Sequence, residues 1–366
     1  MKKILQQPAF IKLFNWEYWP FNVVYAPMFL CWFWFCFRAR SMFFFNTSNP
    51  TIKNGGFLME SKKEIYDLMP AELYPATLPF TAGTPASEVL LQLKERHMNY
   101  PLIAKPDIGL RGMSVQKIDT ENELVDYING SKVDYLVQIF IPFENEIGIF
   151  YYRYPNQQQG RISGIVGKEF LTVEGDGVTP VLELLKRDPR YILQLEVLQQ
   201  THAEILQTVL PKGIVKLLVP YGNHCRGTKF VDVSELIDEK LTHSIDAVCR
   251  KIPGFYFGRM DIRYNTWEEL REGKNFSIIE LNGAGSEPTH IYDPRHSIFY
   301  AWKEILRHWV ILLEISKQNH RQLKMPYMKF SVGMQMLKEN GAYLKLMSTQ
   351  FDLPARAAIL FALFIN

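Results

Sequence analysis

The chain has 366 residues, of which 47% are hydrophobic and 14% aromatic, so it is long enough for two or three packed lobes. Its 41 basic and 38 acidic residues leave a net charge of +3, which gives no electrostatic reason to expect nucleic acid as a partner. The four cysteines form no CxxC pair, which argues against a zinc site or a disulfide framework and is typical of a reducing compartment.

The first predicted element is an uncharged, aromatic stretch at residues 18–37. As a helix its 20 residues would span about 30 Å, the thickness of a bilayer core. Arg38 and Arg40 follow directly, and there is no small-residue cleavage site, so we expect membrane attachment rather than a removed signal peptide. Pro20 and Pro27 interrupt the stretch, which slightly favours an element in the membrane plane over a crossing. A buried core helix is the third alternative.

From residue 61 onward, short strands and helices alternate with glycine-rich turns. Ser61 is typical of a helix N-cap, so a short helix is expected just after it. The segments 135–141 and 146–154 are expected to pair as a hairpin. Further strands are expected at 101–106, 115–118, 161–170, 213–220, 228–234, 254–264 and 276–279, and helices at 121–129, 181–185, 191–208, 234–252 and 297–318. This alternation predicts an α/β (α+β) fold.

Polar side chains stand where the strand at 276–279 ends. Glu280 and Asn282 are two residues apart and therefore point to one side of a strand. Asp261 lies in the preceding predicted strand, and antiparallel pairing of the two strands would place it beside Glu280. Carboxylate and amide oxygens are the ligands that magnesium prefers, so the pattern predicts a metal site. The alternatives are an ordinary solvated strand end and, for Arg259, a simple ion pair with Asp261.

A second group of residues is typical of phosphate binding. Lys105 ends a predicted strand, and the glycine loop 107–115 follows it. Gly109 and Gly112 allow a backbone close enough to bind phosphate through N–H groups, although many hairpins also place a lysine before glycines. The strand at 135–141 could run past an adenine edge, and Glu146 offers an acid for a ribose.

The order of these elements resembles the ATP-grasp superfamily, in particular its D-alanine–D-alanine ligase and cyanophycin synthetase branches. The resemblance runs from about residue 61 to about residue 293. "GDGVTPVLELL" at 175–185 is similar to an element of cyanophycin and glutathione synthetases. "GNHCRGTKFVDVSELID" at 222–238 is similar to another, with Arg226 where a glycine is usual. The resemblance implies two α/β lobes that clasp ATP.

The resemblance also implies a role for each matching residue. Arg259 would stabilise an acyl phosphate, and Lys105 would act both in catalysis and in ATP binding. Gln138 stands where the family usually has an acid. Magnesium, with manganese as the alternative, would be held by Asp261, Glu280 and Asn282. The ATP phosphates would meet Lys62, Lys105, Gly109, Arg111 and Gly112, adenine would lie against Gln138, Ile139, Phe140 and Ile141, and the ribose would meet Glu146.

Family chemistry would make the chain an ATP- and magnesium-dependent ligase that joins a carboxylate to an amine or thiol through an acyl phosphate. A kinase of the same superfamily is the first alternative, and a non-catalytic nucleotide-binding membrane scaffold is the second. The sequence does not specify the carboxylate, the acceptor or the oligomeric state.

The front of the chain departs from the family pattern, because about sixty apolar and turn-rich residues replace the usual α/β domain before the grasp. The chain also resembles sugar-transfer-associated ATP-grasp proteins. We therefore expect a membrane segment and connector at 1–60, an ATP-grasp domain at 61–320 and a helical tail at 321–366. The expected place is the cytoplasmic face of a membrane, and the expected carboxylate is small or lipid-linked. Asn46, Asn49, Lys53 and Asn54 would line the substrate entrance or simply form turns.

Overall fold

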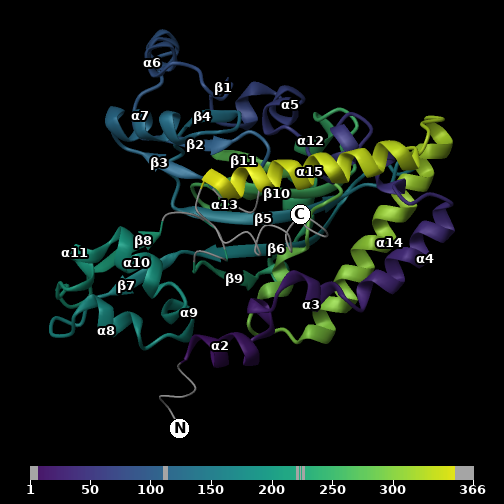
Figure 1. Ribbon diagram of the computed structural model, residues 1–366. Coiled ribbons are helices and arrows are strands. Elements are labelled where there is room, and N and C mark those ends of the chain that lie inside the picture. The colour runs from purple at the N-terminus through teal and green to yellow at the C-terminus, as the bar shows by residue number, and fades with distance from the viewer. Residues whose placement is uncertain (1–6, 110–113, 220–221, 223, 225–226, 351–366) are drawn as a thin grey trace. The chain divides into compact units, whose positions relative to one another are not determined.

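A computed structural model describes residues 7–109, 114–219, 222, 224 and 227–350 (Figure 1). These residues form the predicted mixed α/β fold, with antiparallel sheets. They divide into two compact units, each built from segments that are distant in the sequence. Unit 1 takes the described residues of Met1–Ala26, Val166–Val233 and Thr289–Glu304, and unit 2 takes those of Pro27–Ile165, Ser234–Pro288 and Ile305–Asn366.

The first sheet of unit 2 has the strand order β1-β4-β2-β3. Helices α6 and α7 cover it with apolar side chains at helical spacing, such as Val89 and Leu93, which form one buried cluster with the strands. Neither β1 nor α6 was predicted from the sequence. The strands are β1 (Thr77–Phe80), β2 (Leu102–Pro106), β3 (Gln116–Ile118) and β4 (Tyr135–Ile139), and the helices are α5 (Lys62–Asp67), α6 (Ala86–Glu95) and α7 (Glu121–Gly130).

The second sheet of unit 2 contains, in order, β11, β10, β5 and the first half of β6. The predicted hairpin of 135–141 with 146–154 is wrong, because β4 belongs to the first sheet and β5 pairs with β10. Pro142 lies between them, and a proline cannot donate a ladder hydrogen bond, so the chain leaves the first sheet there. The strands are β5 (Asn145–Tyr152), β6 (Arg161–Glu169), β10 (Phe257–Tyr264) and β11 (Phe276–Asn282).

Helix α12 begins at Glu239, five residues later than the predicted start at residue 234. Asp238 accepts a hydrogen bond from the backbone N–H of Leu241 (2.8 Å) and caps the helix, which divides the expected helix 234–252. Thr266 and Glu269 form a capping box at the start of α13. The elements are η6 (Ser234–Leu236), α12 (Glu239–Arg250) and α13 (Trp267–Arg271).

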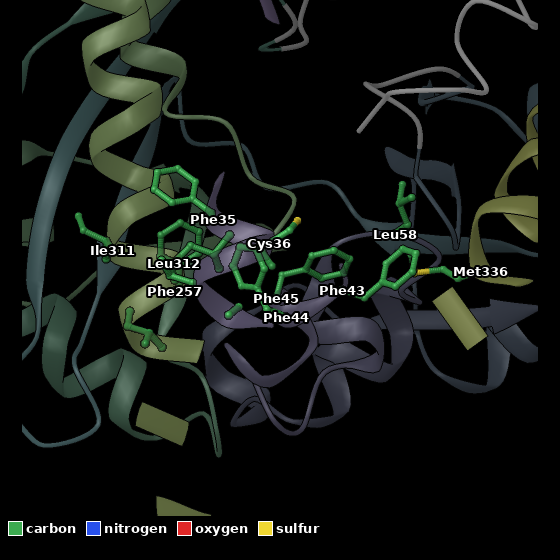
Figure 2. Close-up of a cluster of buried hydrophobic side chains, with 14 of the residues drawn as sticks. Phe35, Cys36, Phe43, Phe44, Phe45, Leu58, Phe257, Ile311, Leu312 and Met336 are labelled. Atoms are coloured by element: carbon green, nitrogen blue, oxygen red, sulfur yellow. The ribbon is translucent and has the colours of Figure 1, made fainter. Parts of the chain in front are cut away.

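The uncharged N-terminal stretch forms two helices, α3 (Phe21–Tyr25) in unit 1 and α4 (Met28–Ala39) in unit 2, which are separated at Pro27. No helix in the described part of the chain is both long enough and apolar enough to cross a membrane. One face of α4 packs into a large apolar cluster of unit 2 (Figure 2). The same cluster includes side chains from β5, β10, α14 (Ile298–Gln322) and α15 (Phe330–Gln350).

The connector after α4 is held by buried asparagines. The Asn49 amide accepts the N–H groups of Tyr256 (2.9 Å) and Phe257 (3.0 Å), and it donates to two carbonyl oxygens. Asn46 accepts the N–H of Met328 (3.1 Å). The entrance hypothesis is wrong for Asn46 and Asn49, because both side chains are buried and bonded to backbone. The exposed Lys53 and the left-handed Asn54 lie in the 3-10 turn η3 (Lys53–Gly56).

The glycines after β11 lie directly against this connector. The N–H groups of Ala284 and Gly285 donate to the carbonyls of Gly55 (3.0 Å) and Gly56 (2.8 Å). A Cβ on Gly283 would lie 2.6 Å from the Gly55 oxygen and 2.8 Å from the Gly56 Cα, closer than atoms can approach. The glycine run that ends β11 is therefore required by backbone packing.

Replacing Gly283 with alanine is expected to lower the free energy of unfolding by about 1–3 kcal/mol, because the two backbones must separate. Urea denaturation measures the change. Gly130→Ala is the matched control, since a Cβ there meets nothing within 4 Å. Equal destabilisation in both variants would contradict this account of the glycine run.

Unit 1 contains the β7–β8 pair and the pairing of Val166–Glu169 with β9. The expected helix 191–208 is divided into short helices. The backbone of His202 is not helical (φ −139°), so α10 ends there. The strands are β7 (Leu171–Glu174), β8 (Val215–Val219) and β9 (Lys229–Asp232), and the helices are α2 (Pro8–Phe14), α8 (Val181–Leu185), α9 (Pro189–Ile192), α10 (Leu195–Thr201) and α11 (Ala203–Leu206).

A buried ion pair between Glu17 and Arg190, with His224 beside it, fixes the N-terminal residues within unit 1. The Glu17 carboxylate accepts two hydrogen bonds from Nη2 of Arg190 (2.9 and 3.0 Å) and lies 3.0 Å from Nε2 of His224. Removing one member would leave buried charge unpaired, which is costly. The N-terminal segment is therefore part of the packed fold of unit 1 rather than a free extension of it.

Candidate active site

The predicted metal ligands meet on neighbouring strands of unit 2. In the antiparallel β10–β11 pair, Asp261 is directly opposite Glu280, and Arg259 is opposite Asn282. The expected juxtaposition of Asp261 and Glu280 is thus confirmed. Directly opposed residues of an antiparallel pair lie on the same face of the sheet, so four polar side chains share one face at the end of β11.

Arg259 neutralises part of the negative charge at this face. Its Nε and Nη2 donate to the two oxygens of Asp261 (3.3 and 3.2 Å), and its Nη1 donates to the carbonyl of Glu287 (3.2 Å). Burial alone would lower the pKa of Arg259, but the carboxylates of Asp261 and Glu280 raise it above its ordinary value. Arg259 therefore remains a cation and can bind a second anion beside the carboxylates.

Asn282 contributes an amide whose hydrogen-bonding capacity is not used by the protein. Its Nδ2 is buried and has no hydrogen-bond partner. A buried polar atom without a partner is costly, and in native structures it often marks the place of a ligand or ion. The two amide ends of an asparagine can exchange by rotation, so the same side chain can present its oxygen to a cation.

Lys62, at the start of α5, and Gly109, in the loop after β2, also lie near these carboxylates. The Lys62 ammonium lies 3.5 Å from Oε1 of Glu280. A Cβ on Gly109 would lie 1.9 Å from the Lys62 nitrogen and 3.6 Å from that same oxygen, so a side chain at residue 109 would displace the Lys62 ammonium from its present position. Lys62 is held here because Ser61 caps α5 and the Lys62 N–H donates to the carbonyl of Asp107 (3.1 Å).

Lys105 places a second ammonium in a desolvated position on β2. Its side chain is buried, and Nζ donates to Oη of Tyr66 (2.9 Å), Oε1 of Gln138 (2.9 Å) and the Ile279 carbonyl (3.1 Å). Burial lowers the pKa of Lys105 to about 8, against the opposing effect of nearby carboxylates such as Glu280. All three partners are uncharged, so the positive charge of Lys105 is not neutralised by direct contact with a carboxylate.

The predicted adenine strand and ribose acid are held by protein partners. Gln138 points inward, since its Nε2 donates to Thr77 (2.7 Å) while its oxygen accepts from Lys105. Glu146 is buried and pairs with Nε of Arg263 (3.2 Å), so its contact with a ribose stays a prediction. Backbone N–H groups of the same segment donate within unit 2, from Ile139 to Ala76 and from Phe140 to Pro101, and the Ile141 carbonyl accepts from Arg263. Arg111 and Gly112 lie outside the described residues.

Three residues of the site were missed from the sequence. Tyr66 contacts Lys105, and it could have been found because it lies one helical turn after Lys62. Arg263 holds Glu146, and its two-residue spacing from Asp261 was the available signal. Glu60 has an Oε2 atom without a hydrogen-bond partner, and burial raises its pKa.

This arrangement fits a magnesium ion together with a phosphate ligand. Among the described residues, no group of three or more His, Cys, Asp or Glu side chains could hold a metal ion. A cation here would therefore take two carboxylates, one amide and oxygens that the protein does not supply. Magnesium is bound in this way, through one or two carboxylates together with waters and phosphate oxygens.

Three comparisons with known proteins give structural neighbours only. No family model and no curated protein matches the sequence. Similar solved structures include a bifunctional glutathione synthetase from Pasteurella multocida, with 14% identity and a TM-score of 0.35, over 70% of this chain and 38% of that one. Another is the VanG D-Ala:D-Ser ligase from Enterococcus faecalis, with 12% identity and a TM-score of 0.38, over 71% and 61%. A third is a D-alanine–D-alanine ligase from Bacillus anthracis complexed with ATP, with 12% identity and a TM-score of 0.38, over 71% and 66%.

The chain thus spans between 38% and 66% of the length of these three structures. The sequence motifs described above also resemble those of D-alanine–D-alanine ligases and glutathione synthetases. With identities of 12–14%, the case for a function rests on the site residues of this chain.

Proposed function

We propose that this chain is an ATP-grasp ligase that uses ATP and magnesium to join a carboxylate to an amine or thiol. The single observation that supports it most is the pairing of Asp261 with Glu280 on adjacent strands, with Arg259 and Lys62 beside them. Two acids alone would repel one another, and two cations alone would bind any anion. Together they suit a phosphate chain that arrives with its magnesium.

Asp261, Glu280 and Asn282 would hold the magnesium, which supplies charge neutralisation at the phosphates. Lys62 and Lys105 would bind phosphate oxygens, and Arg259 would face the group that is transferred. Catalysis of phosphoryl transfer is mostly positioning and electrostatic stabilisation, which these fixed cations provide. The paired carboxylate of Asp261 also keeps Arg259 from rotating away from the site.

In the proposed reaction the substrate carboxylate attacks the γ-phosphorus of ATP, and the bond to ADP breaks. The acyl phosphate so formed is attacked at its carbonyl carbon by the amine or thiol, and inorganic phosphate leaves. We infer that the carboxylate is small or lipid-linked and belongs to envelope synthesis, and that the enzyme works at the cytoplasmic face of a membrane. The aromatic N-terminal segment supports that placement.

The test is a screen for ADP release against membrane extracts and amino-acid pools, followed by trapping with hydroxylamine. A ligase is expected to give a hydroxamate, because hydroxylamine captures the acyl phosphate. A phosphorylated product that is stable to hydroxylamine would identify a kinase instead. A protein that binds ATP but does not turn it over with any pool would favour a non-catalytic scaffold.

The proposal also predicts a pH dependence for ATP affinity. Lys105 has a pKa lowered to about 8, so the free protein loses this positive charge as pH rises through that value. Binding a phosphate requires the charged form, so ATP affinity is expected to fall by up to about tenfold per pH unit above pH 8. Isothermal titration between pH 7 and pH 9.5 measures this. Lys105→Arg should remove the dependence, because a guanidinium stays protonated.

A further inference from the structure

Helix α4 exposes an apolar stripe on the side opposite its buried face. Leu30, Phe33, Trp34 and Phe37 follow the spacing i, i+3, i+4 and i+7, which places them on one side of a helix. Their exposed fractions are 77%, 57%, 55% and 72%. The rings of Trp34 and Phe37 stack, with centroids 5.7 Å apart. A contiguous patch of large apolar side chains on a surface normally marks a binding site.

The opposite face of α4 is fixed in the core. Phe35, Cys36 and Ala39 are buried in the same apolar cluster of unit 2, as Figure 2 shows for the first two. Trp32 packs against Trp309 of α14, with ring centroids 5.0 Å apart, and Figure 1 shows the two helices side by side. The stripe cannot be withdrawn into unit 2 without breaking this core, so it is a permanent surface feature.

The charged residues of α4 and of the residues that directly follow it are all positive. Arg38 and Arg40 are exposed at the C-terminal end of α4, and residues 18–42 contain no acidic side chain. Exposed Met42 continues the apolar surface past the helix end. Trp and Phe on one helix face, next to arginines and without acids, are typical of helices that lie in the interface of an anionic bilayer.

We propose that the exposed face of α4 docks in the plane of an anionic lipid surface. The stripe would enter the boundary between headgroups and acyl chains, while Arg38 and Arg40 meet lipid phosphates. This inference specifies the membrane placement included in the proposed function, but it does not rest on the ligase chemistry. The attachment is peripheral, through one face of a helix that is otherwise part of the protein core.

The experiment is co-sedimentation of the full chain with vesicles of phosphatidylcholine alone or with phosphatidylglycerol. The wild type is expected to bind, and more strongly to the anionic vesicles. Phe33→Gln/Phe37→Gln should weaken partitioning by about tenfold or more, because two aromatic side chains no longer leave water. Arg38→Gln/Arg40→Asn should remove the preference for anionic vesicles, and asparagine suits the left-handed backbone of residue 40.

Two exposed leucines show whether vesicle binding depends on the α4 stripe or on any exposed apolar side chain. Leu30→Gln on α4 should weaken binding, whereas Leu91→Gln on the exposed side of α6 should not. In addition, the shift of tryptophan emission on binding should disappear in Trp34→Phe, while co-sedimentation is kept. Circular dichroism and ATP binding identify variants that fail to fold.

Three results would overturn the docking proposal. The first is wild-type protein that stays in solution with both vesicle types, whether or not it turns over ATP. The second is binding that the stripe variants keep but removal of residues 351–366 abolishes. The third is a dimer in light scattering that Phe33→Gln/Phe37→Gln dissociates without any change in vesicle binding, because a second copy would then occupy the stripe.

Discussion

Glu280→Gln is expected to reduce magnesium-dependent turnover by on the order of 100-fold or more, because it weakens the site for a metal ion that would supply several kcal/mol of transition-state stabilisation. Glutamine keeps the size and one oxygen of the side chain but loses the charge that faces Asp261 across the strand pair. The Glu280 side chain is about one-third exposed, so the fold should tolerate the change. Turnover measured across a range of magnesium concentrations should show a higher metal requirement.

Two further variants make the result specific. Asp261→Asn should lose turnover as well, but it also removes the partner of buried Arg259, so some loss of stability is expected there. Glu72→Gln changes a carboxylate that is mostly exposed and 3.9 Å from Lys251, and its turnover should equal that of the wild type. Wild-type turnover in Glu280→Gln would remove the metal-site interpretation.

The juxtaposition of the candidate metal ligands could be predicted because it depends on local rules. A strand repeats every two residues, so Glu280 and Asn282 had to share a face. The short connection between two successive strands favours antiparallel pairing, and the observed register places Asp261 opposite Glu280. The position of the candidate phosphate-binding residues Lys105 and Gly109 could be predicted for the same reason, because they belong to one continuous strand and loop.

The surroundings of Lys105 could not be predicted, because they depend on contacts between distant segments. Tyr66 is 39 residues away in the sequence, and Ile279 is 174 residues away. Nothing in the sequence indicated that three uncharged partners would enclose the ammonium. The error over the hairpin of 135–141 with 146–154 has the same origin, since the true neighbours of both strands lie elsewhere in the chain.

The N-terminal stretch shows a different limit of sequence reasoning. Because α4 is apolar on both faces, its pattern does not reveal which face is buried and which is exposed. Membrane attachment and a core helix are therefore both compatible with the sequence, and the structure gives α4 a core face with Phe35 and an exposed face with Phe37. The core face also means that a chain beginning near residue 46 would lose part of its core, so surface substitutions are the cleaner experiment.

Lys105→Met is expected to weaken ATP binding by about 10- to 100-fold, the value of one charge-assisted hydrogen bond in a desolvated site. Methionine fills most of the space of the lysine stem, so the loss reports the charge rather than a cavity. Lys62→Met should have a smaller effect, because the Lys62 charge is already shared with Glu280 at 3.5 Å. The Lys105 ammonium donates only to neutral partners, so no carboxylate in direct contact offsets its charge before a phosphate binds.

Isothermal titration with a non-hydrolysable ATP analogue measures both affinities, and Lys94→Met, at an exposed position on α6, is the control for loss of a surface lysine. Thermal unfolding without ligand shows whether Lys105→Met changes the protein before ATP is added. Some stabilisation is expected below pH 8, because the folded state no longer carries a buried ammonium whose pKa is lowered to about 8. A folded Lys105→Met variant that binds the analogue as tightly as the wild type would contradict the assignment of β2 as the phosphate-binding strand.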